Sequence, residues 1–213
     1  MTPGSRPRPL TWLVPAVLTG AAAPFVVLAW KAATGRLGAN PIATALNQLG
    51  LLALVFLVAC LACTPLKVLF GVTWPIRIRK TLGLLAFYTA TSHFLLYAVV
   101  DQGLRLGTVV EDVVKRPFIA VGFAAWLLLV PLAATSTKNA VIRLGFKRWK
   151  RLHRLVYAVA VLAAIHFRMR VKADAREPFV WLGIVAALLC VRLIDGGRDA
   201  PRARRRRSAA AES

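Results

Sequence analysis

Histidine is the residue type in this chain best suited to redox or metal chemistry, and the chain has three: His93, His153 and His166. All three fall in two apolar stretches, at about residues 81–100 and 152–167. An ionisable side chain within an apolar span is costly and is a functional-site hypothesis by default. For one isolated histidine, a hydrogen bond to a neighbouring helix is the simpler interpretation. The relative depth of the three histidines decides between these interpretations.

The elements that must position these histidines are long apolar segments. The chain is 58% hydrophobic and only 17% charged, with a mean hydropathy of +0.64. A helix needs about 20 apolar residues to cross about 30 Å of hydrocarbon. Six segments come near this length, and they predict an all-α integral membrane protein with a six-transmembrane-helix bundle: Leu10–Trp30, Leu46–Phe70, Thr81–Val100, Phe118–Ala134, Leu152–Phe167 and Phe179–Ile194.

The distribution of charge predicts the orientation of these spans. If the N-terminus is cytoplasmic, 20 of the 29 Lys and Arg residues lie inside and nine lie outside. Inner loops of membrane proteins carry this excess of Lys and Arg, so we expect both termini in the cytoplasm. The predicted organisation is a cytoplasmic N-terminus at residues 1–9, a six-helix domain at 10–194 and a basic, disordered cytoplasmic tail at 195–213. The third and fifth helices then both run outward and are parallel.

The net charge of +21 does not indicate a nucleic-acid-binding protein. Such a protein needs a soluble basic face or groove. The densest basic run here, Arg204–Arg207, lies in the short Ala- and Arg-rich tail. An anionic-lipid anchor explains that run better.

Depth along the parallel helices pairs two of the histidines. His93 lies 13 residues beyond Lys80, or about 20 Å, and His166 lies 15 residues beyond Arg151, or about 22 Å. Two imidazoles facing across a bundle at one level can be the axial ligands of one haem b iron. Copper and zinc also bind imidazole but usually take a third or fourth ligand, and the sequence offers none at this depth. The pattern alone leaves haem ligation and a structural role equally open, and His93 and His166 are the candidate haem-iron ligands.

His153 is predicted to lie near the inner edge of the membrane, about 20 Å below His166. The 13 residues between them correspond to about 220° of helical rotation, which puts them on different faces unless the helix is kinked. At the matching depth, the third helix offers Arg79 and Lys80. His153 with Arg79 is thus a candidate for a second haem, a quinone or a flavin, with an interfacial structural histidine as the alternative.

The propionates of a haem are anionic and need basic partners near a membrane interface. Arg168 and Arg170 are candidates on the outer side, and Arg79, Lys80 and Arg151 on the inner side. The same side chains are equally well explained as residues that extend their charged ends toward the interface. The pair Cys60 and Cys63 within the second span is interpreted as small packing residues.

Several short stretches between Asn40 and about Ile194 resemble the MsrQ (YedZ) family, haem-binding membrane subunits of the ferric reductase-like transmembrane group. The residues that carry the resemblance are Arg79–Gly83 with His93-Phe94, Asp101–Leu104, Lys115–Phe118, Leu132–Thr137, and Trp149–Tyr157 with His166-Phe167. A position where family members often have an aromatic residue is Met169 here.

The resemblance implies the electron-transfer subunit of an oxidoreductase system in the bacterial inner membrane. In that family, electrons pass through haem b to a periplasmic molybdopterin enzyme, MsrP, which carries the site that reduces methionine sulfoxide in periplasmic proteins. The implied further cofactor is FMN, and the implied donor is the quinone pool or a cytosolic flavin reductase. By position, His93 and His166 match the family's outer haem pair. His153 matches its remaining histidine, and Arg79 stands where larger relatives have the partner of His153.

Two other classes of membrane protein are less consistent with the sequence. A transporter is expected to show more charge within the membrane or inverted repeats. An assembly or scaffold protein would leave the histidines incidental. No Gly-rich dinucleotide-binding fingerprint is present, so any use of NAD(P)H is expected to belong to another protein.

Overall fold

The computed structural model describes residues 10–171 and 176–209, with side chains described as far as residue 195. This part of the chain is helical and has no strand. The elements are α1 (Leu13–Ala33), α2 (Pro41–Phe70), α3 (Pro75–Leu95), a π-helical turn η1 (Leu96–Asp101), α4 (Leu106–Lys115), α5 (Pro117–Ala134), α6 (Lys138–Leu144), α7 (Phe146–His153), α8 (Leu155–Arg170) and α9 (Arg176–Ala209).

Six helical segments are long and apolar enough to cross a membrane, which confirms the predicted six-helix membrane fold. Their bounds are Leu13–Ala33, Pro41–Phe70, Pro75–Asp101, Pro117–Ala134, Phe146–Arg170 and Arg176–Asp195. Three of them begin at proline, which is favoured at the first helical position because its fixed φ suits a helix and its missing N–H costs nothing there. This explains why the second and third spans start several residues before the predicted limits.

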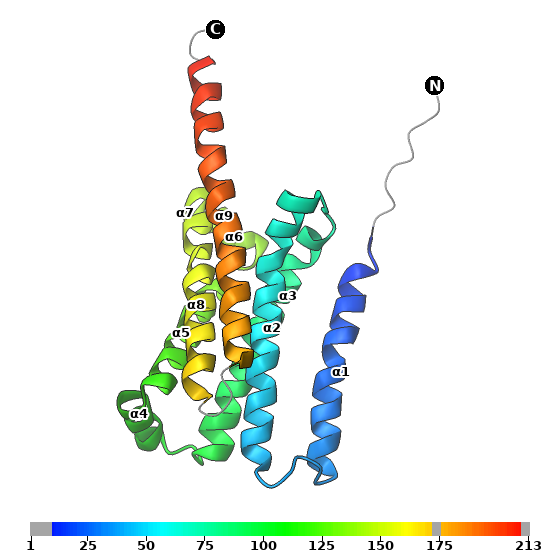
Figure 1. The fold of residues 1–213 in the computed structure, drawn as a ribbon, viewed down its shortest axis with the longest axis vertical. Helices are drawn as coiled ribbons and strands as arrows, with labels where there is room; N and C mark the ends of the chain where they lie inside the picture. The colour runs from blue at the N-terminus through cyan, green and yellow to red at the C-terminus, as the bar shows by residue number, and fades with distance from the viewer. Residues whose placement is uncertain (1–9, 172–175, 210–213) are drawn as a thin grey trace.

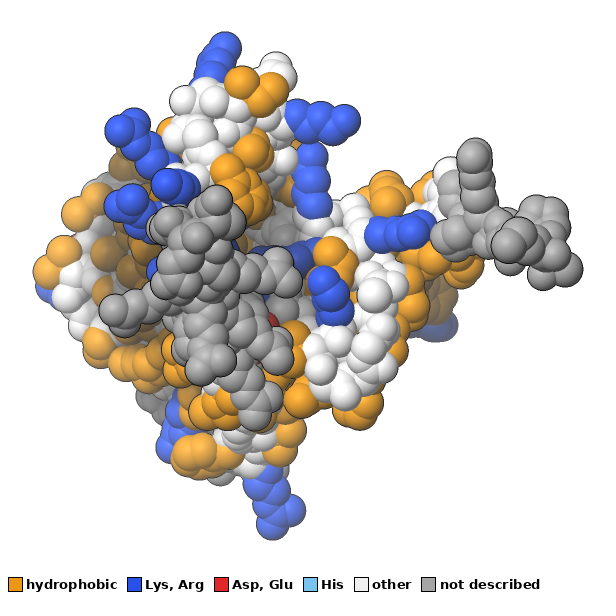
Figure 2. Space-filling model, turned by 90° about the horizontal axis from the view of Figure 1, so that it is seen from above, with side chains coloured by type: hydrophobic (Ala, Val, Ile, Leu, Met, Phe, Trp, Pro, Cys, Tyr) orange, Lys and Arg blue, Asp and Glu red, His pale blue; other side chains and the backbone are white. Residues whose placement is uncertain are grey.

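The bundle is organised around α2, which packs along α3 and also contacts α8 and α9, while α5 packs along α8 (Figure 1). Helix α1 stands to one side with few contacts to the others. The start of α1 and the end of α9 lie at the same end of the bundle (Figure 1), as an even number of spans requires. Lys and Arg side chains surround this end, and acidic side chains are almost absent from its visible face (Figure 2). The cytoplasmic placement of this end stays a prediction.

A buried arginine completes the packing where proline interrupts α2. Pro65 has no N–H, so the carbonyl of Leu61, four residues earlier, lacks its usual helical donor. Arg192 of α9 donates to this carbonyl at 2.7 Å and to the hydroxyl of Tyr157 on α8 at 3.1 Å. The side chain of Arg192 is only 9% exposed. This arginine therefore joins α9 and α8 to α2 at the break.

Two features of the structure go beyond the predicted spans. Helix α9 runs past the sixth predicted span, through Ala209. The division of the chain at residue 195 and the disorder of the tail stay predictions. The short amphipathic helices α4, α6 and α7 were not predicted as separate elements. Each is too short or too polar to be found by a search for apolar spans.

Candidate functional site

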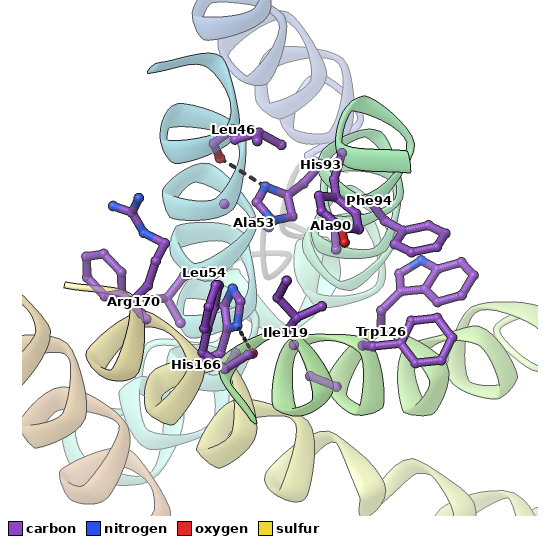
Figure 3. Close-up of a pocket in the computed structure, with 18 of the residues that line it drawn as sticks. Leu46, Ala53, Leu54, Ala90, His93, Phe94, Ile119, Trp126, His166 and Arg170 are labelled. Carbon is purple, nitrogen blue, oxygen red and sulfur yellow. Dashed lines mark hydrogen bonds between the residues drawn. The ribbon is translucent and has the colours of Figure 1, made fainter. Parts of the chain in front are cut away.

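The two histidines that the sequence places at the same depth, His93 and His166, lie opposite each other in the structure. The rings of His93 on α3 and His166 on α8 have centroids 6.4 Å apart, and their planes are nearly perpendicular, at 83°. Both rings project into one space between α2, α3, α5 and α8 (Figure 3). Two imidazoles bound to one metal at about 2.0 Å each would have centroids about 6 Å apart. The observed spacing therefore fits two axial ligands of a single iron.

Both imidazoles are oriented by the same kind of hydrogen bond. Nδ1 of His93 lies 2.9 Å from the carbonyl oxygen of Leu46 on α2, and Nδ1 of His166 lies 2.6 Å from that of Phe118 on α5. A carbonyl only accepts, so each Nδ1 must carry the proton and donate it. The tautomer so fixed leaves the lone pair on Nε2, which is the arrangement of a histidine prepared to bind a metal.

A glycine makes room for each ring. Gly50 follows the acceptor Leu46 by four residues on α2, and Gly122 follows Phe118 by four on α5. A Cβ atom at Gly50 would lie 3.3 Å from Cε1 of His93, which is a tight contact. At Gly122 it would lie 2.6 Å from Nδ1 of His166, which is a clash. This role of the two glycines was not predicted, because a glycine beside a ring from another helix carries no local sequence pattern.

The two rings line a cavity of about 360 Å³ with mostly apolar walls. Ligand pockets in proteins have volumes of about 300–1,000 Å³ and apolar walls with a few placed polar groups. One wall is aromatic: Phe94 stacks on Trp126 at 4.6 Å, and Phe123 stacks on the same indole at 5.8 Å. The indole N–H donates to the hydroxyl of Thr91, which fixes the wall to α3. A cavity of this kind fits a large, flat, apolar cofactor.

The polar residues of the cavity gather at one end. Arg170, Arg116 and Asp101 line it there. Arg116 is also paired with Asp112 at 3.1 Å, and the hydroxyl of Tyr97 donates to the same carboxylate at 2.7 Å. Of the five predicted propionate partners, only Arg170 lines the cavity; Arg116 and Asp101 were not predicted. Anionic groups of a bound cofactor would find their cationic partners at this end.

The other predicted propionate partners lie elsewhere. Arg168 donates to the carbonyl of Val171 at 3.4 Å, and its guanidinium lies 5.0 Å from the ring centroid of Phe179. Lys80 and Arg151 are exposed, and neither lines the cavity. Their assignment to propionates stays a prediction that this cavity does not support.

His153 and Arg79 do not line the cavity. His153 ends α7 and Arg79 lies near the start of α3, whereas Arg170 ends α8. A turn at Arg154 separates α7 from α8. Nδ1 of His153 is 3.3 Å from the carbonyl of Trp149, and the two rings stack at 4.1 Å. Arg79 is close enough to His153 to interact with it electrostatically. That His153 and Arg79 hold a second cofactor stays a prediction.

No group of three His, Cys, Asp or Glu side chains able to hold a metal occurs within residues 10–171 and 176–195. The facing pair therefore suits a metal whose remaining ligands are not protein side chains. A haem iron meets this condition, because the porphyrin supplies four nitrogens and leaves two axial positions.

Comparisons with known proteins assign the fold to a family. Residues 44–164 match the model of the ferric reductase-like transmembrane component family. The protein-methionine-sulfoxide reductase heme-binding subunit MsrQ of Deinococcus radiodurans is 51% identical over 188 residues, which cover 88% of this chain and 93% of the relative. The chain belongs to the MsrQ family. No solved structure shows a significant match to it.

Other members of the MsrQ family match over a similar length. The heme-binding subunit MsrQ of Rhodospirillum rubrum is 48% identical over 198 residues, covering 93% of this chain and 92% of the relative. That of Brucella ovis is 46% identical over 187 residues, covering 88% and 84%. Family membership and the six spans together make this chain a multi-pass membrane protein.

Proposed function

We propose that this chain is the haem-binding electron-transfer subunit of a methionine sulfoxide reductase system of the bacterial inner membrane. The observation that carries the proposal is the pair His93 and His166, with ring centroids 6.4 Å apart and both Nδ1 atoms bonded to backbone carbonyls. Support comes from the MsrQ relatives, whose names describe heme-binding subunits of a protein-methionine-sulfoxide reductase.

Haem b held by this pair would supply a one-electron Fe(III)/Fe(II) couple. The residues of this chain set the conditions for it. The hydrogen bonds at Nδ1 leave Nε2 of His93 and of His166 free to bind a metal, the walls are mostly apolar, and Arg170 and Arg116 provide positive charge. Axial ligands, hydrogen bonds to them and burial are the means by which a protein tunes such a couple. The cavity thus has the parts that an electron carrier needs.

The inner end of the bundle is the proposed entry for electrons. The candidate donor is the quinone pool or a cytosolic flavin reductase, and FMN is the proposed second cofactor. Arg79 and His153 are the residues that we propose for a second haem, quinone or flavin. Haem reduction by quinol or by a reduced flavin reductase would distinguish the donors.

The proposed electron acceptor is the periplasmic molybdopterin enzyme MsrP, which would carry the methionine sulfoxide site. The proposed docking surface is residues 101–116 and 168–177, because described residues of both segments, among them Arg116 and Arg170, line the cavity. Residues 172–175 of the second segment lie outside the described part of the chain.

The decisive experiment is an optical difference spectrum, reduced minus oxidised, of the protein purified in detergent. We expect the bands of a six-coordinate b-type haem, and their loss in His93→Ala and His166→Ala. Ser92→Ala is the matched control, because this neighbour of His93 is exposed and bonds only its own helix. Added imidazole should partly restore the bands in the histidine variants. Full haem content in both histidine variants would refute the ligand assignment.

A further inference from the structure

Helix α4, Leu106–Lys115, connects η1 and α5 at the end of the bundle where α8 ends (Figure 1). Its side chains divide into three faces by helical periodicity. One face contacts the bundle, a second is apolar and exposed, and a third is polar. Residues 101–116 are a docking candidate by location, but the three faces of α4 have no separate roles in that proposal.

The face toward the bundle is fixed by buried contacts. Val109 is 8% exposed and Asp112 is 7% exposed. Asp112 accepts a hydrogen bond from Tyr97 of η1 and pairs with Arg116 at the start of α5. Val113, one residue further on, lines the haem cavity together with Arg116. This face of α4 therefore covers the polar end of the cavity.

The apolar face consists of three residues spaced four apart. Leu106 is 74% exposed, Val110 is 63% exposed and Val114 is 79% exposed. No residue of the described chain covers this row, which we call the α4 stripe. On the other side of the helix lie Thr108 and an ion pair between Glu111 and Lys115. The stripe thus lies between the bundle face and the polar face.

We propose that α4 lies in the membrane leaflet at this end of the bundle, with the α4 stripe immersed among lipid acyl chains. This contact with lipid holds the helix over the cavity. A helix with one apolar and one charged side lies in the membrane interface. The flanking residues support lipid as the occupant. The span before α4 ends at Asp101 and the span after it begins at Pro117, so both ends of the helix are at the membrane boundary. The apolar side chains of Val100 and Leu104, 53% and 63% exposed, lie just before the stripe.

Spin labels test whether the α4 stripe lies in lipid, and this test does not depend on haem. Single cysteines at positions 106, 110 and 114, and at 108, 111 and 115 as the matched set, are labelled in lipid nanodiscs. Cys190→Ala provides the background, because Cys190 is exposed whereas Cys60 and Cys63 are buried. We expect labels on the stripe to collide with oxygen, which concentrates in acyl chains, and labels on the polar set to collide with a water-soluble nickel complex.

Two results would overturn the proposal. Stripe labels that collide with nickel as often as the polar set would show that the stripe faces water. Stripe labels shielded from both reagents would show that a protein, either a partner or a second copy of this chain, covers it.

A second experiment tests the consequence for the cavity, and it rests on the proposed haem site. Val110→Glu should move labels at positions 106 and 114 toward water and speed the transfer of haem to apomyoglobin several-fold. Thr108→Glu adds the same charge to the polar face and should change neither measurement. If the labels move toward water but haem transfer is not faster, the proposal that lipid contact holds α4 over the cavity is refuted. If the parent protein holds no haem, the proposed function fails, whereas the label data still show whether the α4 stripe lies in lipid.

Discussion

Gly122 of α5 and His166 of α8 approach so closely that a Cβ atom on the glycine would lie 2.6 Å from Nδ1 of the imidazole. The nitrogen in question is the one that donates to Phe118. Any side chain at this position must therefore displace the ring from its hydrogen bond. The equivalent contact at Gly50 is 3.3 Å, to Cε1 of His93, so that ring can give way by a few tenths of an ångström.

Alanine at the two glycines should have graded effects. We expect Gly122→Ala to lower haem content strongly and Gly50→Ala to lower it slightly, because only the first forces the ligand to move. Gly183→Ala is the control, since its Cβ would meet nothing within 4 Å. Haem per protein, measured by pyridine haemochrome and protein assay, checks the order. Equal loss in all three variants would show that helix packing, and not the ligand, responds.

The angle between the two imidazole planes predicts a spectroscopic property. The planes meet at 83°, fixed by the carbonyls of Leu46 and Phe118. Nearly perpendicular axial imidazoles on low-spin ferric iron give a highly anisotropic EPR signal, whereas parallel planes give a rhombic one. We expect the anisotropic signal from the oxidised protein at low temperature. A rhombic signal would mean that one ring turns away from its carbonyl.

Arg192 should stabilise the fold mainly because Pro65 leaves a carbonyl unpaired. Replacing this arginine by Met removes the donor to Leu61 and should cost about 1–3 kcal/mol, the usual penalty for a buried unpaired polar group. In a Pro65→Ala background the residue at 65 supplies an N–H to that carbonyl, so the same replacement should cost less. Thermal unfolding in detergent of the two single variants and the double variant measures the coupling. Additive effects on the free energy of unfolding would show that Arg192 and Pro65 act independently.

Trp149 should protect His153, the last residue of α7. Its ring stacks on the imidazole at 4.1 Å, and its N–H donates to the carbonyl of Thr135 at 2.9 Å. Trp149→Ala should raise the rate at which diethylpyrocarbonate modifies His153, and Trp149→Phe, which keeps a ring but loses the hydrogen bond, should raise it less. Peptide mass spectrometry gives the rate for each histidine. Unchanged modification in Trp149→Ala would show that the stack does not shield the imidazole.

The sequence was sufficient to predict the spans and the pairing of His93 with His166, because both follow from length, hydropathy and rise per residue along parallel helices. It could not reveal Gly122 or Arg192, whose roles depend on contacts between helices far apart in the chain. Helix α4 was not predicted for another reason. Its apolar residues form a short amphipathic stripe and not a span, so a search for transmembrane segments passes over it.

The two arginines near the end of α8 were predicted as equivalent propionate partners, and the structure separates them. Arg170 lines the cavity, whereas Arg168 lies over the ring of Phe179. A cation beside an iron stabilises the less positive, reduced state, so its removal lowers the midpoint potential. We expect Arg170→Gln to lower the potential and weaken haem retention, and Arg168→Gln to leave both near the parent values. Spectroelectrochemical titration of the purified variants measures the potential. If Arg168→Gln shifts the midpoint potential as much as Arg170→Gln does, the structural distinction between the two arginines is wrong.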